Sequence, residues 1–415
     1  MKKGISPKEC KTICLGFASE EEYERLVEER EEYRKYVIAQ SIAYPELFSS
    51  NIKEGFKFCG FVESKKQGLK QRRLKLTDDE VYQIRPSFVM PYMISKTAEI
   101  EKALYLRQWG VPFEALAYVF GGSAMFYYRA YLSLGRPSIV ATTIKKPEML
   151  PQHLLADEKH TWINGEKLFG AMTVAEGCIL GVGIAQTAQT KDLTEAYQDF
   201  KDEAVAFKPD YQPLTVNTDG WLATQLAWRA LFINITLILC FLHAWLKIQN
   251  GAKRLTQVFP QLKKQVWHLY HSNNRATFAQ RLRRFRDWAI TKLPNEPALA
   301  KILQLSHKSA HFKIAFDHPQ SYRTSAHLDR LMNYQDRQLY AAQYFHGHLS
   351  SAKLFLRASA MLWNFHPYGT RTQANFPNRS SPFADLNGFQ YHPNLLHNFL
   401  ISSSHQGSSF KHIIR

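Results

Sequence analysis

The stretch HLLADEKHTWI, residues 153–163, decides the fold of this chain, because it is a largely apolar run that ends at the turn Asn164-Gly165. Two further runs of this kind follow at 167–175 and 178–186, joined by Glu176-Gly177. Tight turns between short apolar runs are typical of neighbouring antiparallel strands. We therefore predict an antiparallel meander of three strands.

Helical and extended patterns alternate after this meander. The sequence predicts a helix over 192–207, a strand over 214–220, a helix over 221–232 and a strand over 235–241. Two late helices are expected, one beginning near Thr324 and one over 354–365. Antiparallel strands followed by alternating helices and strands form a mixed sheet, so the predicted fold class of this part is α/β.

The charge balance predicts a polyanionic partner. The 415 residues include 53 Lys and Arg against 36 Asp and Glu, for a net charge of +17. A hydrophobic content of 45%, with only 21% charged residues, excludes a disordered basic tail. Five cysteines are too few for the disulfide framework of a secreted protein. A folded basic chain of this kind is expected to meet nucleic acid or an anionic membrane surface.

The most apolar stretch argues against the membrane. It runs over 231–246, which is shorter than the roughly 20 residues that a membrane span needs, and Arg229 and Lys247 bracket it. The lysines near the N-terminus are not followed by the apolar segment of a signal peptide. We therefore expect a cytoplasmic protein that binds nucleic acid and no membrane.

Residues 95–135 predict a helix-turn-helix domain. A Gly-Val-Pro turn at 110–112 separates a first helix from a short second one, and Gly-Gly at 121–122 precedes a third helix. This is the layout of trihelical DNA-binding domains. A structural helical bundle is the alternative interpretation. In the DNA-binding interpretation, the third helix presents Tyr127, Tyr128 and Arg129 to a DNA groove.

Two segments concentrate the positive charge. The strip at 65–75 contains Arg72 and Arg73 and is a candidate for phosphate contact, with a solvated loop as the alternative. Residues 250–293 predict polar helices with ten Lys and Arg against Asp287 alone. That imbalance favours phosphate contact over a merely solvated face. The residues expected to make the contact are Arg281, Arg283 and Arg284.

These patterns predict five parts of the chain. They are an N-terminal region with the basic strip (1–94), the helix-turn-helix domain (95–135), a linker (136–152), an α/β domain with a helical insertion at about 244–310 (153–365) and an extended tail (366–415). The tail assignment follows from its richness in Pro, Ser, Asn and His.

Three aspartates have a common predicted destination. Asp157 lies inside the first strand of the sheet, Asp219 stands at the end of a later strand, and Asp329 opens a late helix. A single aspartate in such a place is most often a turn residue or a helix cap. Ligands of open α/β sheets, however, bind at the carboxyl ends of strands. Converging carboxylates repel each other unless a hard divalent cation such as Mg²⁺ neutralises them.

Four short motifs in order resemble the DDE/D transposases. They are ADE at 156–158, NTDG at 217–220, CFLH at 240–243 and TSAHLDR at 324–330. The chain is most similar to the bacterial insertion-sequence and mutator-like group. That group has a ribonuclease H-like core, a Cys-x2-His pair after the second aspartate and a helical insertion before the third acid. The 110 positions between Asp219 and Asp329 leave room for such an insertion.

The resemblance implies a DNA transposase. Asp157, Asp219 and Asp329 would hold two Mg²⁺ ions, or Mn²⁺ in their place, for strand cleavage at the element ends and strand transfer into target DNA. It implies terminal inverted repeats and target DNA as double-stranded partners, a homo-oligomer assembled on DNA, and a bacterial cytoplasmic protein found on the nucleoid when bound. Supporting roles would fall to Cys240, His243 and Arg337.

One departure from the family keeps two alternatives open. The family usually has Glu as its third acid, whereas this chain has Asp329 there. Competitors for that role are Asp336, Asp317 and Glu296. The alternatives are a catalytically inactive, transposase-derived DNA-binding protein and a regulator that uses only residues 95–135. A zinc site is not indicated, because Cys10, Cys14 and Cys59 form an incomplete ligand set.

Overall fold

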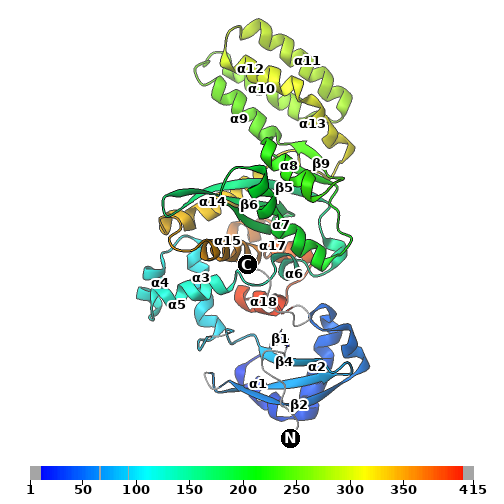
Figure 1. The fold of residues 1–415 in the computed structure, drawn as a ribbon, viewed down its shortest axis with the longest axis vertical. Coiled ribbons are helices and arrows are strands. Elements are labelled where there is room, and N and C mark those ends of the chain that lie inside the picture. Colours follow the sequence, from blue (N-terminus) through cyan, green and yellow to red (C-terminus); the bar gives the residue numbers. More distant parts are fainter. Residues whose placement is uncertain (1–10, 65–66, 92, 405–415) are drawn as a thin grey trace.

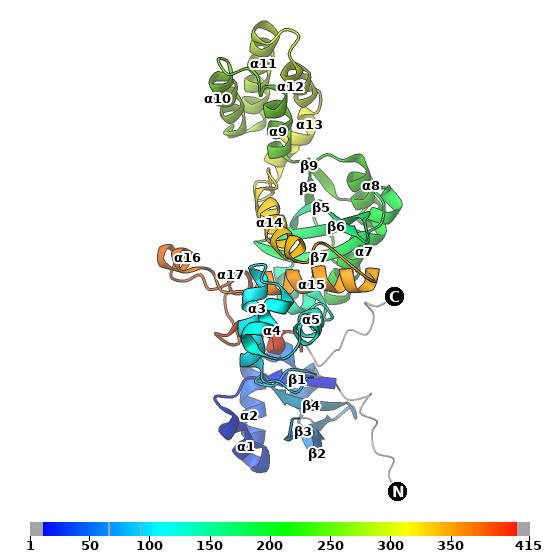
Figure 2. The ribbon, with the colours of Figure 1, turned by 90° about the vertical axis from the view of Figure 1, so that its left-hand side faces the viewer.

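The chain is a mixed α/β protein in this computed structural model, which describes residues 11–64, 67–91 and 93–404. Two views at right angles show the same order of parts along the long axis (Figures 1 and 2). A small N-terminal sheet lies at one end, a second sheet with its helices lies in the middle, and a bundle of helices lies at the far end.

The N-terminal region is an α/β unit. Its sheet has the strand order β1-β4-β3-β2, with β1 parallel to β4 and the other pairs antiparallel. Ser19 caps α1 by accepting a hydrogen bond from the backbone N–H of Glu22, and α1 buries Tyr23. The bounds are β1 (Lys11–Leu15), α1 (Glu20–Glu28), α2 (Arg30–Ala43), η1 (Pro45–Leu47), η2 (Ser50–Glu54), β2 (Phe56–Ser64), β3 (Leu69–Leu76) and β4 (Val81–Pro86).

The basic strip is a paired strand, so its interpretation as a solvated loop was wrong. Residues 69–76 form β3 between β2 and β4, while residues 65 and 66 lie outside the described part of the chain. Arg72 is 6% exposed, and its guanidinium donates to the carbonyl oxygens of Val27 and Glu28. Arg72 therefore fixes α1 to the sheet and is not available to a phosphate, in contrast to its predicted role.

Three helices follow as predicted over 95–135. They are α3 (Thr97–Gln108), α4 (Phe113–Phe120) and α5 (Ala124–Ser133), and Ser123 caps the third by accepting from the backbone N–H of Phe126. They are not an isolated domain, because Arg107 of α3 donates to the carbonyl oxygen of Gln338 and Tyr131 of α5 donates to the Gln338 side chain.

The segment predicted as a linker at 136–152 is part of the core. It contains α6 (Ile139–Thr143), all of whose residues are buried, and η3 (Pro147–Met149). The carboxylate of Glu203 accepts from the Ser138 hydroxyl and from the backbone N–H of Val140. These contacts tie the segment to the central sheet layer, so no flexible connection separates the helices from the sheet.

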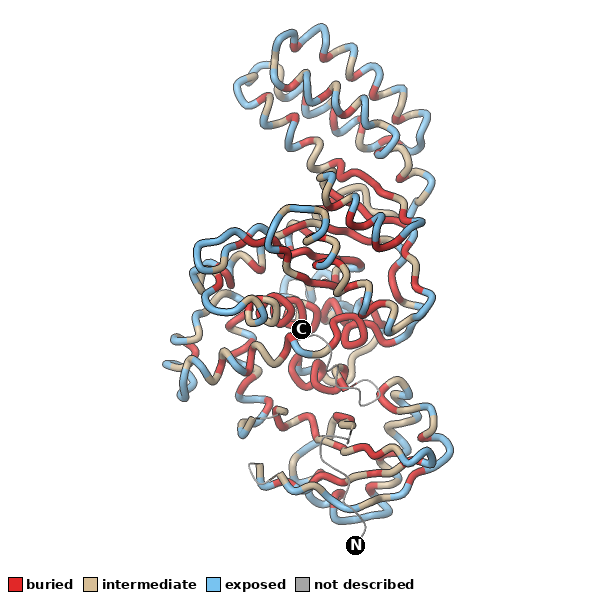
Figure 3. Tube along the Cα trace, viewed as in Figure 1, coloured by how far each residue is buried: buried red, intermediate tan, exposed pale blue. Residues whose placement is uncertain are grey.

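The central sheet confirms the predicted meander and mixed pairing. Its order is β7-β6-β5-β8-β9, with β5, β6 and β7 antiparallel and with β8 and β9 parallel to β5. Figure 3 shows much of this middle layer buried; β7 and β8 are almost continuously buried, whereas β5 has buried and partly exposed residues. The bounds are β5 (His153–Ile163), β6 (Glu166–Ala175), β7 (Cys178–Ala185), β8 (Thr215–Thr218) and β9 (Thr236–Leu239), each within two residues of the predicted start and end.

Helices cover the two faces of this sheet. On one face lie α7 (Thr190–Phe207) and α8 (Leu222–Leu231), which share an apolar core with Leu154 and Ala156. The approach of α7 requires glycine at 183, since a Cβ there would lie 2.0 Å from the carbonyl oxygen of Ala196. On the other face, α14 (Ala326–Ala341) and α15 (Leu349–Phe365) pack against the cluster that includes Leu155.

The helical insertion is larger than the predicted 244–310. It comprises α9 (Phe241–Gly251), α10 (Phe259–Tyr270), α11 (Arg275–Lys292), α12 (Pro297–His307), α13 (Ser309–Lys313) and η4 (Ile314–Asp317). These helices have their own apolar core. The backbone N–H of Phe241 donates to the carbonyl oxygen of Arg323 at 2.9 Å, so the insertion leaves and re-enters the sheet domain at one point.

The C-terminal segment is folded over residues 366–404, so the predicted extended tail was wrong for these residues, while 405–415 lie outside the described part of the chain. It contains α16 (Thr370–Asn375), α17 (Pro382–Asn387) and α18 (Leu395–Ser402), and every residue of α18 is buried. His397 of α18 hydrogen-bonds Ser87, and Lys145 donates to the carbonyl oxygen of Ser402. This helix thus joins the N-terminal region to the central domain.

The apolar stretch at 231–246 is shared by three elements. It contains the end of α8, all of β9 and the first half of α9. In the described ranges between residues 11 and 404, no helix combines the length and apolar character that a bilayer crossing requires.

Candidate metal centre

The strand register brings the first two predicted acids together. Three pairs of β5 and β8 residues are each 62 positions apart, from His153 with Thr215 to Leu155 with Asn217. The same offset separates Asp157 from Asp219, which directly follows β8. Because side chains two residues apart on a strand share a face, Asp157 points to the face on which α14 packs. The carboxyl end of β8 therefore lies beside Asp157.

The third acid reaches Asp157 from a helix. Ligand atoms of Asp157, His243 and Asp329 all lie within 4.8 Å of one another, and among the described residues this is the only such group of three or more metal-ligating side chains. His243 lies in the first turn of α9 and Asp329 in the first turn of α14. The cluster is thus built from β5 and from the two helices at the base of the insertion.

Ser325 links the members of the cluster. The sequence indicated this residue only through its position four residues before Asp329. Its hydroxyl donates to Asp329 Oδ2 at 3.2 Å and lies 3.4 Å from His243 Nδ1. Its backbone N–H donates to Cys240 Sγ at 3.2 Å. The buried Cys240 and the predicted Cys-x2-His pair therefore fix the start of α14, and with it Asp329.

The cluster perturbs the protonation of its members. Burial, reinforced by the charges of Asp219 and Asp329, raises the pKa of Asp157 to about 6. A hydrogen bond with Cys240, together with the charges of Asp157 and Asp329, raises the pKa of His243 to about 9. An excess of negative charge thus gathers at this end of the sheet and favours a bound cation.

Asp219 belongs to the rim of the cluster and not to the group of three. Its Oδ1 accepts from the backbone N–H of Trp221 at 2.7 Å, which closes the turn that precedes α8. Gly220, with φ at +93°, lies in this turn between β8 and the helix. The charge of Asp219 nevertheless contributes to the raised pKa of Asp157. Asp219 thus combines the role of a turn residue with a place at the edge of the centre.

The competing acids have other partners. Asp336 pairs with Lys159 at 2.5 Å, and Asp317 pairs with Arg275 at 2.7 Å. Glu296 directly precedes α12 in the insertion. Among these acids, only Asp329 lies within the group of three metal-ligating side chains.

Arg337 does not support the centre, in contrast to the prediction. Its guanidinium lies 5.7 Å from the ring centroid of Trp109 and 5.0 Å from that of Tyr334. It therefore stacks α14 on the end of α3. The helix that carries Asp329 is held in part by this contact.

Glu158 lies on the opposite face of the sheet, as predicted from strand alternation. It is 6% exposed and accepts from the hydroxyls of Tyr197 and Thr224 at 2.8 and 2.7 Å. Burial raises its pKa to about 7. Its role is to bind α7 and α8 to β5.

No protein-family model matches the chain, and no curated protein matches it.

The donor set fits a divalent ion with a preference for oxygen ligands. Two or three carboxylates with water in the remaining positions suit Mg²⁺. The imidazole of His243 beside them also suits Mn²⁺, which accepts mixed nitrogen and oxygen ligands. Cys14 is buried in the N-terminal core, and Cys10 lies outside the described residues.

The residues predicted to contact DNA differ in their exposure. Tyr127 is 5% exposed and its hydroxyl donates to the carbonyl oxygen of Gly121, so it is a packing residue and its predicted groove contact was wrong. Tyr128 is half-buried and packs against Phe113, whereas Arg129 is exposed.

The insertion presents more of its arginines to solvent. Arg283 and Arg284 are exposed on α11. Arg281 donates to the carbonyl oxygens of His268 and His271 and so closes the turn between α10 and α11. Arg73 lies half-buried on β3.

Proposed function

We propose that this chain is a metal-dependent DNA transposase with a ribonuclease H-like core, which cleaves DNA strands at element ends and transfers them into target DNA. One observation carries the proposal. Asp157 lies next to the carboxyl end of β8, where Asp219 stands, and α14 brings Asp329 to the same point after a basic helical insertion. An antiparallel meander followed by two parallel strands supports the assignment of the core.

The chain's own residues would hold the reacting groups in place. Asp157 and Asp329 would bind Mg²⁺ or Mn²⁺ directly, with Asp219 at the rim and His243 as hydrogen-bond partner or ligand. Two divalent ions would supply the activation of the attacking oxygen and the stabilisation of the leaving oxygen. The protein's share is to position the phosphodiester and to offset its charge, and no protein nucleophile is required.

The charge distribution supports DNA as the partner. Residues 241–323 contain fifteen Lys and Arg against three Asp and Glu, so the insertion supplies +12 of the net charge of +17. Double-stranded DNA with terminal inverted repeats and target DNA are the proposed partners, with a homo-oligomer assembled on them. The proposed location is the bacterial cytoplasm, on the nucleoid when bound.

A catalytically inactive DNA-binding descendant is the second candidate. Two observations favour it, namely the shorter third acid Asp329 and the engagement of the Asp219 carboxylate by the backbone N–H of Trp221. A regulator built from residues 95–135 alone is disfavoured, because α5 buries Tyr131 against α15.

The test is strand cleavage of DNA that flanks the gene, in Mg²⁺ or Mn²⁺. We expect the wild-type chain to nick at the ends of inverted repeats and Asp219→Ala to lose this activity. The exposed Asp210→Asn is the matched control and should cleave normally. If wild type and Asp219→Ala are equally inactive on repeats that both bind, the enzyme proposal fails and the inactive descendant stands.

A further inference from the structure

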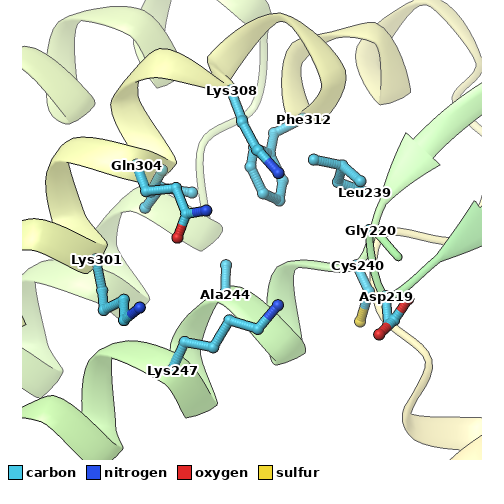
Figure 4. Close-up of a pocket in the computed structure, with 11 residues that line it drawn as sticks. Asp219, Gly220, Leu239, Cys240, Ala244, Lys247, Lys301, Gln304, Lys308 and Phe312 are labelled. Carbon is cyan, nitrogen blue, oxygen red and sulfur yellow. The ribbon is translucent and has the colours of Figure 1, made fainter. Parts of the chain in front are cut away.

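A pocket lies where the insertion meets the carboxyl ends of β8 and β9 (Figure 4). One wall comes from the sheet and contains Asp219 and Cys240. The opposite wall comes from α9 and α12, with Phe312 of α13 behind them. The remaining lining residues are Gly220, Leu239, Ala244, Lys247, Lys301, Gln304, Leu305 and Lys308.

Three lysines converge on this pocket from two helices. Lys301 and Gln304 are three residues apart on one face of α12, and Lys308 follows directly after the helix, at its junction with α13. Lys247 approaches from α9, one turn after Ala244. Figure 4 shows the ammonium groups of Lys247 and Lys308 directed into the space between the two helices and Asp219. We call Lys247, Lys301 and Lys308 the lysine triad.

The triad lacks acidic partners. All three lysines are exposed, and among the described residues none of them has an ion pair or a side-chain hydrogen bond. The insertion's acids are engaged elsewhere, Asp317 with Arg275 and Asp287 with Arg286. The pocket's own acid, Asp219, lies on the sheet wall, across the pocket from Lys301. Like charges around one opening repel each other unless an anion lies between them.

The pocket adjoins the metal centre through Cys240 and Asp219. Cys240 lines it, and Cys240 Sγ lies 3.2 Å from the Ser325 hydroxyl, which in turn donates to Asp329. Asp219 also lines it and acts on the charge of Asp157. A polyanion held by the triad would therefore extend directly towards the carboxylates.

We propose that the lysine triad binds a backbone phosphate of the DNA strand whose neighbouring phosphodiester lies at the metal centre. This rests on the proposed function and adds a positioning site to it. The ammonium groups neutralise the phosphate, and the amide of Gln304 donates to one of its oxygens. A strand fixed on both sides of Asp219 cannot slide, so the bond to be cleaved is presented in one place.

The test measures DNA binding without divalent ions, so that it does not depend on cleavage. Binding of a labelled 20-base-pair duplex to the full chain is followed by fluorescence anisotropy in EDTA over a range of salt concentrations. The variant is Lys247→Gln/Lys301→Gln/Lys308→Gln. The matched control is Lys146→Gln/Lys191→Gln/Lys208→Gln, which removes the same charge away from the pocket.

We expect the triad variant to bind roughly tenfold more weakly or worse at low salt, and the slope of log K against log salt to fall by about 0.9 for each phosphate that the variant no longer neutralises. The control should lose less than half as much on a logarithmic scale. Equal losses in the two variants, or no loss in the triad variant, would overturn the proposal. Lys→Arg at all three positions should preserve binding, which separates charge from misfolding.

A second arm distinguishes DNA from free phosphate. Inorganic phosphate is added at constant ionic strength to the wild-type complex. No displacement beyond that caused by chloride is expected, because a single ion lacks the other interactions of the strand. Displacement by millimolar phosphate in wild type, and none in the triad variant, would assign the pocket to the free ion and overturn the DNA proposal. If DNA binding depends on the triad but no cleavage occurs under any condition, this inference stands and the enzyme proposal fails.

Discussion

The two faces of the central sheet treat adjacent carboxylates in opposite ways. Glu158 is enclosed by α7 and α8, and two hydroxyls donate to it. Among the described residues, Asp157 has the backbone N–H of Glu158 as its hydrogen-bond donor, and it faces His243 and Asp329. Burial raises the pKa of both acids, but only Asp157 belongs to a group of metal-ligating side chains in the described part of the chain. An acid with a raised pKa therefore indicates a functional site when other ligating side chains converge on it.

The largest effect is expected on DNA-cleavage activity, which should depend on Asp157 on one face of the sheet and not on Glu158 on the other. Asp157→Asn removes the charge that would hold the proposed metal ion, while it keeps the shape of the side chain. We expect DNA cleavage to fall by about 10²- to 10³-fold or more, since a group that stabilises charge during reaction is removed. Glu158→Gln, which still accepts from Tyr197 and Thr224, should retain activity within a few-fold. Initial rates of nicking in Mg²⁺ check both, and equal losses would contradict the contrast.

The next largest effect is expected on stability. Here the substitution of Glu158 should cost more than the substitution of Asp157. Glu158→Ala leaves the buried hydroxyls of Tyr197 and Thr224 without an acceptor, at about 1–3 kcal/mol each. We therefore expect the free energy of unfolding in urea to fall by roughly 2–6 kcal/mol. Asp157→Ala should leave the free energy of unfolding unchanged or raise it, because a half-buried charge with one backbone donor is removed. A larger loss at Asp157 than at Glu158 would reverse the assignment.

A smaller effect should appear in the pH dependence of stability without divalent ions. The pKa of Asp157 is about 6 in the folded chain against 3.8 for the free side chain, so the folded state binds more protons between these values. Stability should therefore fall as pH rises from about 4 to 6, by about 1–3 kcal/mol. Asp157→Asn should flatten this part of the curve. Glu158→Gln should flatten it up to about pH 7, since the pKa of Glu158 is about 7. Urea midpoints at each pH measure both, and an unchanged slope in Asp157→Asn would refute the linkage.

The sequence predicted the sheet well because its strands are apolar and bounded by turns. β5 to β7 were found within two residues, and strand alternation correctly separated Asp157 from Glu158. The N-terminal sheet was missed, because β3 carries Lys and Arg at half of its positions and charged runs usually indicate loops. The packing of α1 on this sheet depends on the hydrogen bond from Arg72 to the carbonyl oxygen of Val27, which the sequence does not indicate.

The candidate site was predicted in its residues more than in its geometry. The order of motifs indicated Asp157, Asp219, Asp329 and His243, and three of these converge. Sequence could not show that Asp219 would accept from the backbone N–H of Trp221 or that Ser325 would connect Cys240 to Asp329, since both depend on where α8 and α14 begin. Arg337 and Tyr127 were misassigned because exposure, which depends on packing between distant helices, has no local signal.

The burial of α18 has a consequence for how the protein is made. Leu396 of this helix donates through its backbone to Glu101 of α3, and the Ser402 hydroxyl donates to the carbonyl oxygen of Thr142 in α6. Surfaces synthesised early thus remain uncovered until residues 395–402 have left the ribosome. A copy shortened by a nonsense codon before this helix would expose apolar surface on α3, β1 and α15, and cellular proteases would remove it. Resistance to proteolysis therefore requires synthesis of the chain through α18.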